Sequence, residues 1–208
     1  MPRRVDHQQR RLEIAAALWR LAQRGRLEGA SLNEVAAEAG ISKGLVQHYF
    51  GSRDELLNFA MTHLRDRIDR RLRDSAQEAP ADHRAALRAV LIALLPLDDD
   101  GADEVHANHA LFNQALRDDS VATRFRAGRD QILTLIAGHL KRARDAGEIR
   151  ADRQPRQEAR IALSVIAGIA EAVLLGHQTH ASALRTLDYH LAQLFMPHDD
   201  DHAAPRPS

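Results

Sequence analysis

The chain has 208 residues, and its 29 arginines and lysines balance its 29 aspartates and glutamates, so the formal net charge is zero. Aromatic residues make up only 4% of the chain, a composition that favours helices over sheets. The absence of cysteine excludes disulfides, thiolate zinc sites and cysteine nucleophiles. Because the longest apolar run, 89–97, is too short to span a bilayer and no signal peptide is evident, we expect a soluble, cytoplasmic protein.

The charge is unevenly distributed. Residues 1–50 hold eight basic and five acidic residues, a net charge of +3, and four of the eight basic residues fall within the first eleven positions. Such a density suits contacts to phosphate, although a solvated terminus would look the same.

Capping signals divide the first part of the chain into short helices. Asp6 and Gln9 resemble a capping box, which predicts a first helix over 7–24. Ser31 and Glu34 form a second box before a helix of about two turns, and Gly40 suits a left-handed position at its end.

The next two helices are predicted in the same way. Ser42 can cap a helix that ends near Phe50, with Ile41 and Val46 placed as a hydrophobic staple. Ser52 and Glu55 form a third capping box at the start of a helix over 53–75.

The rest of the chain shows helical periodicity with short connectors and no strand candidate. We therefore predict an all-α protein of about nine helices, in which an N-terminal three-helix unit with a helix-turn-helix precedes a helical C-terminal domain. The remaining helices are expected over 82–95, 102–116, 120–146, 155–177 and 181–195.

Two short helices joined by a glycine turn form a helix-turn-helix, whose second helix enters the major groove of DNA. Val46 and Phe50 are four residues apart and can point together into the core, which leaves a polar arc facing outward. The candidate DNA-binding residues are Arg3, Arg4, Ser31, Ser42, Lys43, Gly44, Leu45, Gln47, His48, Tyr49, Ser52 and Arg53.

Different side chains on this arc suit different contacts. Lys43 brings positive charge, Gln47 can make bidentate hydrogen bonds to adenine, and Leu45 can meet a thymine methyl group. Gly44 lets the backbone approach closely, and Tyr49 can donate to a phosphate oxygen.

The segment SLNEVAAEAGISKGLVQHYFGSRDELL resembles the DNA-binding signature of the TetR family of bacterial transcriptional regulators. Two further segments, LLPLDDD and ARDAGEIRADRQPRQEARIALSVIAGIAEAVLL, are similar to the regulatory domain of the choline-sensing betaine-repressor branch. The family commonly has a hydroxyl residue and an aromatic where Leu45 and Gln47 stand here, so we expect an operator of its own.

The resemblance implies a DNA-binding domain at 1–52 and a ligand-binding and dimerisation domain at 53–197, and the composition of the last residues predicts a disordered tail at 198–208. The resemblance also implies a homodimer that binds a palindromic stretch of double-stranded DNA, acts as a repressor, and is released by a small-molecule effector.

Two apolar segments, 159–176 and 184–195, are candidates for the dimer interface, where two helices from each subunit would form a four-helix contact. Burial of both segments inside a monomer is the alternative. The candidate interface residues are Ile161, Val165, Gly168, Ile169, Ala172, Leu187, Leu191 and Leu194.

The family places the effector among the helices that follow the DNA-binding domain. The candidate contacts are Phe59, His63, Leu91, His109, Phe112, Asn113, Phe125, Arg129 and Ile136, many of which would serve equally well in core packing. Because this part of the chain has no tryptophan for an aromatic cage, we expect an uncharged or anionic apolar effector rather than choline.

Two histidine pairs, His106 with His109 and His177 with His180, have a spacing that could share a metal ion, but no third ligand stands at a fixed distance. We therefore expect no metal and no cofactor. Motifs of phosphate-binding loops, serine hydrolases and zinc proteases are also missing, so we do not expect an enzyme. The alternatives are an all-helical metal- or small-molecule-binding protein or enzyme with a vestigial helix-turn-helix, and a DNA-binding adaptor without a ligand.

Overall fold

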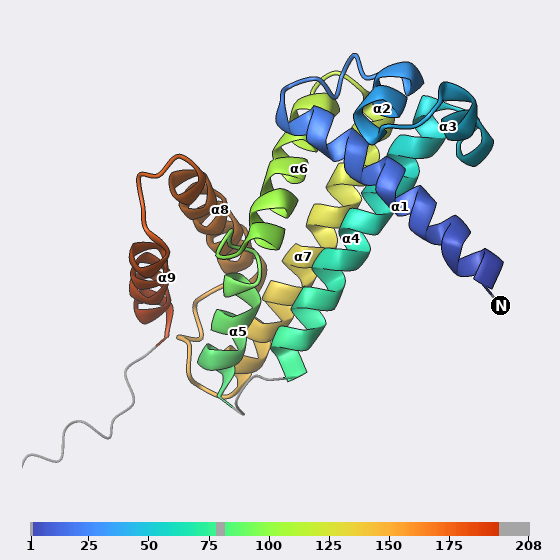
Figure 1. The fold of residues 1–208 in the computed structure, drawn as a ribbon. Coiled ribbons are helices and arrows are strands. Elements are labelled where there is room, and N and C mark those ends of the chain that lie inside the picture. Colours follow the sequence, from blue (N-terminus) through green and yellow to red (C-terminus); the bar gives the residue numbers. More distant parts are fainter. Residues whose placement is uncertain (1, 78–81, 196–208) are drawn as a thin grey trace, which may run out of the picture. The chain divides into compact units, whose positions relative to one another are not determined.

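The computed structural model describes the backbone of residues 2–77 and 82–195, and the side chains of 7–75 and 82–195. This part of the chain forms helices and no strand (Figure 1). The helices are α1 (Pro2–Gln23), α2 (Leu32–Ala39), α3 (Lys43–Tyr49), α4 (Arg53–Gln77), α5 (His83–Ile92), α6 (Asp99–Ala115), α7 (Asp119–Asp145), α8 (Pro155–Leu174) and α9 (His180–Leu194). The predicted all-α fold is confirmed.

The helix boundaries differ from the predicted ones mainly at four ends, one of which is the start of α6, at Asp99 rather than at 102. Helix α1 already begins at Pro2, so Asp6 lies inside the helix and the predicted capping box with Gln9 is wrong. Helix α5 ends at Ile92, three residues before the predicted end, and a tight turn then leads to Pro96. Helix α8 ends at Leu174, two residues before Gly176, whose φ of 71° is left-handed.

The chain divides into two compact units, which are described separately here. The first consists of 1–72 and 98–129, and the second of 73–97 and 130–208. Helices α4 and α7 each begin in the first unit and end in the second. Helix α6 therefore packs with the predicted DNA-binding segment, whereas the functional division at residue 52 stays a prediction.

The first unit is built around one apolar core to which α1, α2, α3, α4, α6 and α7 contribute. Its fully buried members include Ile14, Val35, Val46, Leu56 and Val121. Helix α6 packs on α1. Helices as short as α2 and α3 are not stable in isolation, so packing in this core stabilises them.

Two polar contacts reinforce this packing. The amide of Gln23 on α1 donates to Asp103 on α6 at 2.9 Å. The loops that follow α1 and α6 are joined by an ion pair between Glu28 and Arg117. Helix α6 and the loop after it are thus attached directly to α1 and the loop after α1.

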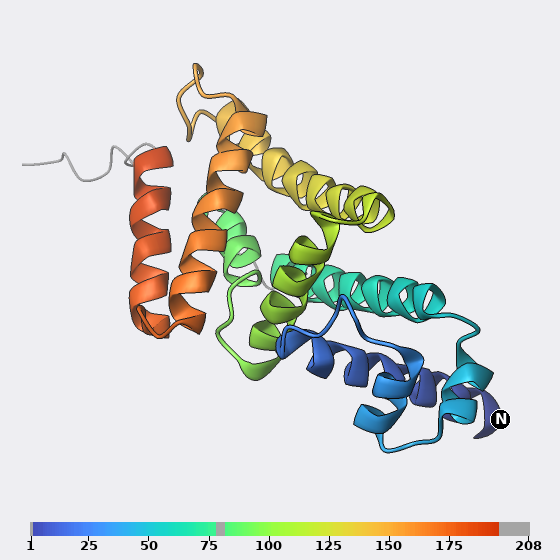
Figure 2. The same ribbon diagram turned by 90° about the horizontal axis from the view of Figure 1, so that it is seen from above.

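The second unit is held by packing of α9 on both α8 and α5 (Figure 2). Leu187 and Leu191 on α9 and Leu87 on α5 are fully buried. Arg88 on α5 donates to both carboxylate oxygens of Asp188 on α9, at 2.5 and 3.1 Å, and its hydrogen bonds lower the pKa of Asp188. Among the described residues, no helix is long and apolar enough to cross a membrane.

Candidate nucleic-acid interface

Helix α2 begins and ends as its sequence predicts. The hydroxyl of Ser31 accepts from the amide of Glu34 at 3.3 Å, and the Glu34 carboxylate accepts from the amide of Ser31 at 2.9 Å. These hydrogen bonds, led by the one from the Ser31 backbone, lower the pKa of Glu34. Gly40 follows with a left-handed φ of 67°. Both the capping box and the glycine turn are therefore confirmed.

Helix α3 starts at Lys43, three residues after Gly40, and Ser42 is its N-cap. The hydroxyl of Ser42 accepts from the amide of Leu45 at 3.2 Å, and the amide of Phe50 donates to the carbonyl of Val46 at 2.9 Å. Val46 and Phe50 are both fully buried, as the spacing predicted. The backbone turn and these two side chains fix which face of α3 points outward.

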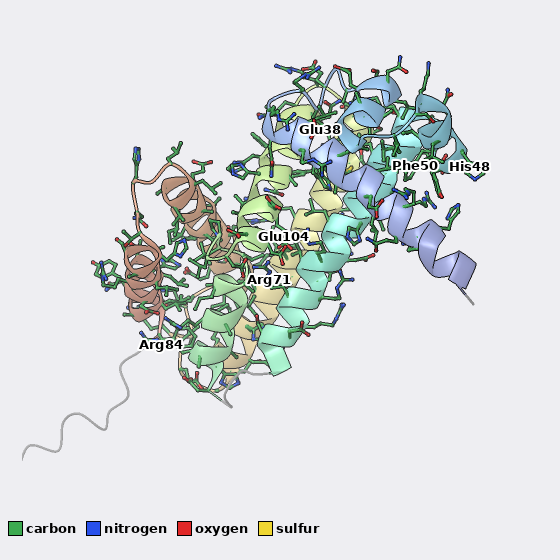
Figure 3. All side chains as sticks on the ribbon, viewed as in Figure 1. Glu38, His48, Phe50, Arg71, Arg84 and Glu104 are labelled. Carbon is green, nitrogen blue, oxygen red and sulfur yellow. The ribbon has the colours of Figure 1, made fainter. Side chains whose placement is uncertain are left out.

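The outward face of α3 carries the predicted polar arc. Lys43, Gly44, Gln47 and His48 are exposed, and Figure 3 shows His48 on the outside of α3. Leu45 and Tyr49 are half-buried, so only part of each side chain is accessible on this face.

Four other predicted DNA contacts already have partners inside the protein. The hydroxyls of Ser31, Ser42 and Ser52 each accept from a backbone amide at a helix start. The guanidinium of Arg53 donates to the carbonyls of Ala30 at 3.0 Å and Leu27 at 2.6 Å, which ties α4 to the loop after α1. The three serines remain exposed, so a bond from each hydroxyl to a phosphate stays a prediction.

The predicted third capping box is formed only in part. Ser52 accepts from the amide of Glu55 at 3.1 Å, but the Glu55 carboxylate accepts from the amide of Gly51 at 2.9 Å. The reciprocal bond thus reaches one residue further back than a capping box requires.

Most of the positive charge in the first 50 residues is already paired. Arg20 on α1 and Arg24, just after α1, both bind the carboxylate of Glu38, at 2.9 and 2.7 Å, which joins this part of the chain to α2 and lowers the pKa of Glu38. Arg26 pairs with Glu34, and Arg10 pairs with Glu13. Lys43 is exposed and has no ion pair with a described residue. The side chains of Arg3 and Arg4 lie outside the described residues.

One residue next to this surface was missed by sequence reasoning. The ring of His7 on α1 lies 4.6 Å from the ring of Tyr49, and His48 meets the same tyrosine edge-on at 5.2 Å. Tyr49 is thus flanked by two imidazoles. The sequence holds no signal for this contact, because it depends on how α1 crosses α3.

The predicted dimer interface needs a correction on α9. Leu187, Leu191 and Leu194, together with Ile169 on α8, are buried in the core of the second unit itself, so they cannot also face a second subunit. The periodicity correctly predicts an apolar stripe on α9, but this stripe packs inside its own subunit. Tyr189, on the other side of α9, is 71% exposed.

The α8 part of the prediction lies at the surface. Ile161 and Gly168 are exposed, and Val165 and Ala172 are half-buried. Leu175, which follows α8 and was not among the candidates, is 70% exposed.

The predicted effector contacts fall in both compact units. Leu91 and Ile136 are fully buried in the second unit, and the other seven lie in the first. In the first unit, the rings of Phe59 and His63 are stacked 6.5 Å apart, and burial is the main cause of the lowered pKa of His63. Phe112 is half-exposed against Phe125, with ring centroids 6.1 Å apart. A common binding site for this set stays a prediction.

A buried carboxylate that the sequence did not single out lies between α4 and α6. Glu104 binds the Nε atoms of Arg67 at 3.2 Å and Arg71 at 3.5 Å (Figure 3). Burial raises the pKa of Glu104 and outweighs the two guanidinium groups, which lower it. Asp100 and Asp98, at the start of α6, bind the outer nitrogens of the same two arginines.

Among the side chains that the structure describes, no group of three or more histidine, aspartate or glutamate residues could hold a metal ion.

The helix-turn-helix and the all-helical remainder are typical of a transcriptional regulator with an N-terminal DNA-binding domain. Residues 14–59 match the family model of bacterial regulatory proteins of the tetR family, and residues 83–196 match that of the C-terminal domain of BetI-type transcriptional repressors. The chain belongs to the TetR family of transcriptional regulators. Its matched families and relatives are regulators and not enzymes, which decides against the enzymatic alternative.

Individual relatives agree with this assignment. The transcriptional regulator PksA of Bacillus subtilis is 36% identical over 105 residues, which cover 50% of this chain and 51% of PksA. The chain spans about half the length of the curated relatives it matches.

Solved structures share the fold over most of the chain. A transcriptional regulator from Rhodococcus has a TM-score of 0.74 at 29% identity, over 88% of this chain and 95% of that one. A regulator from Saccharomonospora viridis, solved in complex with choline, has a TM-score of 0.77 at 19% identity, over 91% of this chain and 100% of that one.

Proposed function

We propose that this protein is a repressor that binds double-stranded operator DNA as a homodimer through α3 and is released by a small-molecule effector. The observation that carries the proposal is the exposed polar arc of Lys43, Gly44, Gln47 and His48, held outward by the buried side chains of Val46 and Phe50. A surface of this kind fits the major groove. Binding to chromosomal DNA places the protein in the cytoplasm.

The residues of the arc divide by the part of DNA that they suit. Gln47 can pair with an adenine edge, and no atom lies within 4 Å of a β-carbon built on Gly44, so the backbone there is open to close approach. Lys43 suits phosphate, because its charge has no partner among the described residues. Tyr49 offers a hydroxyl beside the rings of His7 and His48.

The proposed dimer contact is the exposed and half-buried stripe of α8, which continues to Leu175 just after the helix. Ile161, Val165, Gly168, Ala172 and Leu175 recur at alternating intervals of four and three residues, the spacing of a helix seam. A β-carbon built on Gly168 would meet no atom within 4 Å. A helix from a second subunit can therefore approach α8 closely at this point.

We place the effector in the part of the chain after α3. The match to BetI-type C-terminal domains covers 83–196, and the regulator from Saccharomonospora viridis was solved with choline. Choline is thus the first compound to test, although the aromatic side chains of this region are phenylalanines and one tyrosine, a poor cage for a quaternary ammonium group. An uncharged or anionic apolar compound remains our expectation.

The test is a selection of genomic DNA fragments by the purified full-length protein, followed by mobility-shift assays of the recovered sites at several salt concentrations. We expect a palindromic site and an affinity that falls steeply with salt. Recovery of no preferred sequence would contradict the proposal. A thermal-shift screen with choline and with apolar carboxylates then separates a ligand-responsive regulator, whose melting temperature rises with its effector, from an adaptor without a ligand.

A further inference from the structure

The position of α3 depends on very few buried contacts. The helix has seven residues, of which only Val46 is buried, and the chain then passes through Phe50, which is fully buried. A helix this short is not stable alone, so its orientation depends on its packing against α2, on the half-buried Leu45 and Tyr49, and on these two fully buried side chains. Contacts that hold Phe50 in place therefore help to hold the surface of α3.

Arg11 on α1 holds Phe50. The central carbon of its guanidinium lies 4.6 Å from the ring centroid of Phe50 and 4.4 Å from that of Phe59 on α4, and the two ring centroids are 5.4 Å apart. One guanidinium nitrogen of Arg11 lies 3.5 Å from the carboxylate of Glu55. Three elements, α1, the end of α3 and the start of α4, thus meet at one side chain.

This environment differs from that of a phosphate-binding arginine. The Arg11 side chain is 25% exposed, and its Nε atom is buried without a hydrogen-bond partner in the structure. Its neighbour Arg10 is more exposed and pairs with Glu13 on the same helix. A planar guanidinium can pack against two aromatic rings at once, which the ammonium group of lysine cannot do equally well.

We infer that Arg11 is a positioning residue, which orients α3 for DNA binding by packing against the rings of Phe50 and Phe59, and that it does not contact phosphate. The inference rests on the proposed DNA-binding function. It also revises the expectation from charge alone, which counted Arg11 among four basic residues suited to phosphate.

The experiment compares Arg11→Lys, Phe59→Leu and the double variant, in the full-length protein, on a random-sequence DNA duplex over a range of salt concentrations. The lysine keeps the charge, and the leucine changes no charge at all. We expect each single variant to weaken binding by roughly 3- to 10-fold at every salt concentration, with an unchanged salt slope. The double variant should bind no more weakly than the weaker single variant, because both act on the same contact.

Two controls separate positioning from other effects. Lys43→Gln should lower the magnitude of the salt slope by about 1.8, because the dimer loses two phosphate contacts, one from each subunit, at about 0.9 each. Val121→Ala, in the core of the same unit, should lower the melting temperature without changing the affinity at a temperature where the protein is folded.

In the Arg11→Lys variant, the amide of Phe50 should exchange with solvent faster than in the wild type.

Wild-type affinity for DNA with both Arg11→Lys and Phe59→Leu would overturn the inference. Unchanged affinity with Arg11→Lys alone would also overturn it, because a lysine replaces a phosphate contact but not the stacking. If the wild-type protein itself failed to retard DNA, the proposed function would fall instead, and the exchange rate of the Phe50 amide would still report whether Arg11 holds that residue.

Discussion

Arg65 on α4 lies across Gly128 on α7, where a β-carbon would stand 2.7 Å from its Nη2 atom. The same nitrogen donates to the carbonyl of Arg124 at 3.0 Å. The missing side chain at Gly128 is thus what lets an arginine of one helix reach the backbone of the next. Both residues belong to the first compact unit, so this contact fixes α4 against the start of α7.

Gly128→Ala should therefore gain little stability. A glycine inside a helix costs about 1 kcal/mol relative to alanine, but the new methyl group would displace Arg65 and cost a hydrogen bond of about 0.5–1.5 kcal/mol. Gly138→Ala on the same helix is the matched control, because the nearest atom there is 3.7 Å away. Urea unfolding should show a gain of up to about 1 kcal/mol for Gly138→Ala only. Equal gains for both variants would show that the Arg65 contact contributes nothing.

Glu104→Gln should change how stability depends on pH. The pKa of Glu104 is raised above 4.5 in the folded protein, chiefly by burial, so the unfolded chain loses this proton first as the pH rises. Between the two pKa values the unfolded state binds fewer protons, and the stability of the wild type falls with increasing pH. The Glu104→Gln variant has no carboxyl group here, so its stability should not show this decrease with pH.

The measurement is the free energy of unfolding of both proteins from about pH 4 to about pH 7. The value for the variant minus that for the wild type should rise with pH, because only the wild type must bury an ionised Glu104. Asp100→Asn is the control, since the Asp100 side chain is 78% exposed and its pair with Arg67 should matter little. A difference that stays constant with pH would show that the two arginines balance burial, and one that falls with pH would show that they outweigh it.

Gln47→Ala and Tyr49→Phe should affect DNA binding differently. Loss of the Gln47 amide should change the order of preference among selected sites by about 1–3 kcal/mol, because a base contact is specific to sequence. Loss of the Tyr49 hydroxyl should weaken all sites alike, since its ring still packs between His7 and His48. Competition between two selected duplexes measures both effects, and a uniform loss with both variants would contradict the division into base and phosphate contacts.

Ile161→Arg should produce a folded monomer. Ile161 is 43% exposed on the proposed dimer stripe of α8, so a charge there is tolerated within one subunit but not at an apolar contact between two. Leu187→Ala, in contrast, removes a fully buried side chain and should cost about 2–5 kcal/mol of unfolding free energy. Light scattering after gel filtration measures the molecular mass of Ile161→Arg, and chemical unfolding measures the stability of Leu187→Ala. An Ile161→Arg variant with the mass of a dimer would show that the interface lies elsewhere than on this stripe.

The sequence by itself determined the local structure of the helix-turn-helix. Ser31, Glu34, Gly40 and Ser42 cap α2 and α3 as predicted, because a cap involves groups only three or four residues apart in the chain. The buried positions of Val46 and Phe50 follow from the same short range. The sequence alone therefore predicts the polar face of α3 that we propose as the DNA-binding surface.

Only the tertiary structure decided which partner each side chain takes from a distant part of the chain. Arg53 binds the carbonyls of Leu27 and Ala30 rather than standing free, and Arg11 packs against Phe50 instead of remaining a surface charge. The apolar stripe of α9 packs inward, although its period would serve a dimer equally well. Periodicity shows that a helix has an apolar face, but which surface covers that face is a property of packing between elements far apart in sequence.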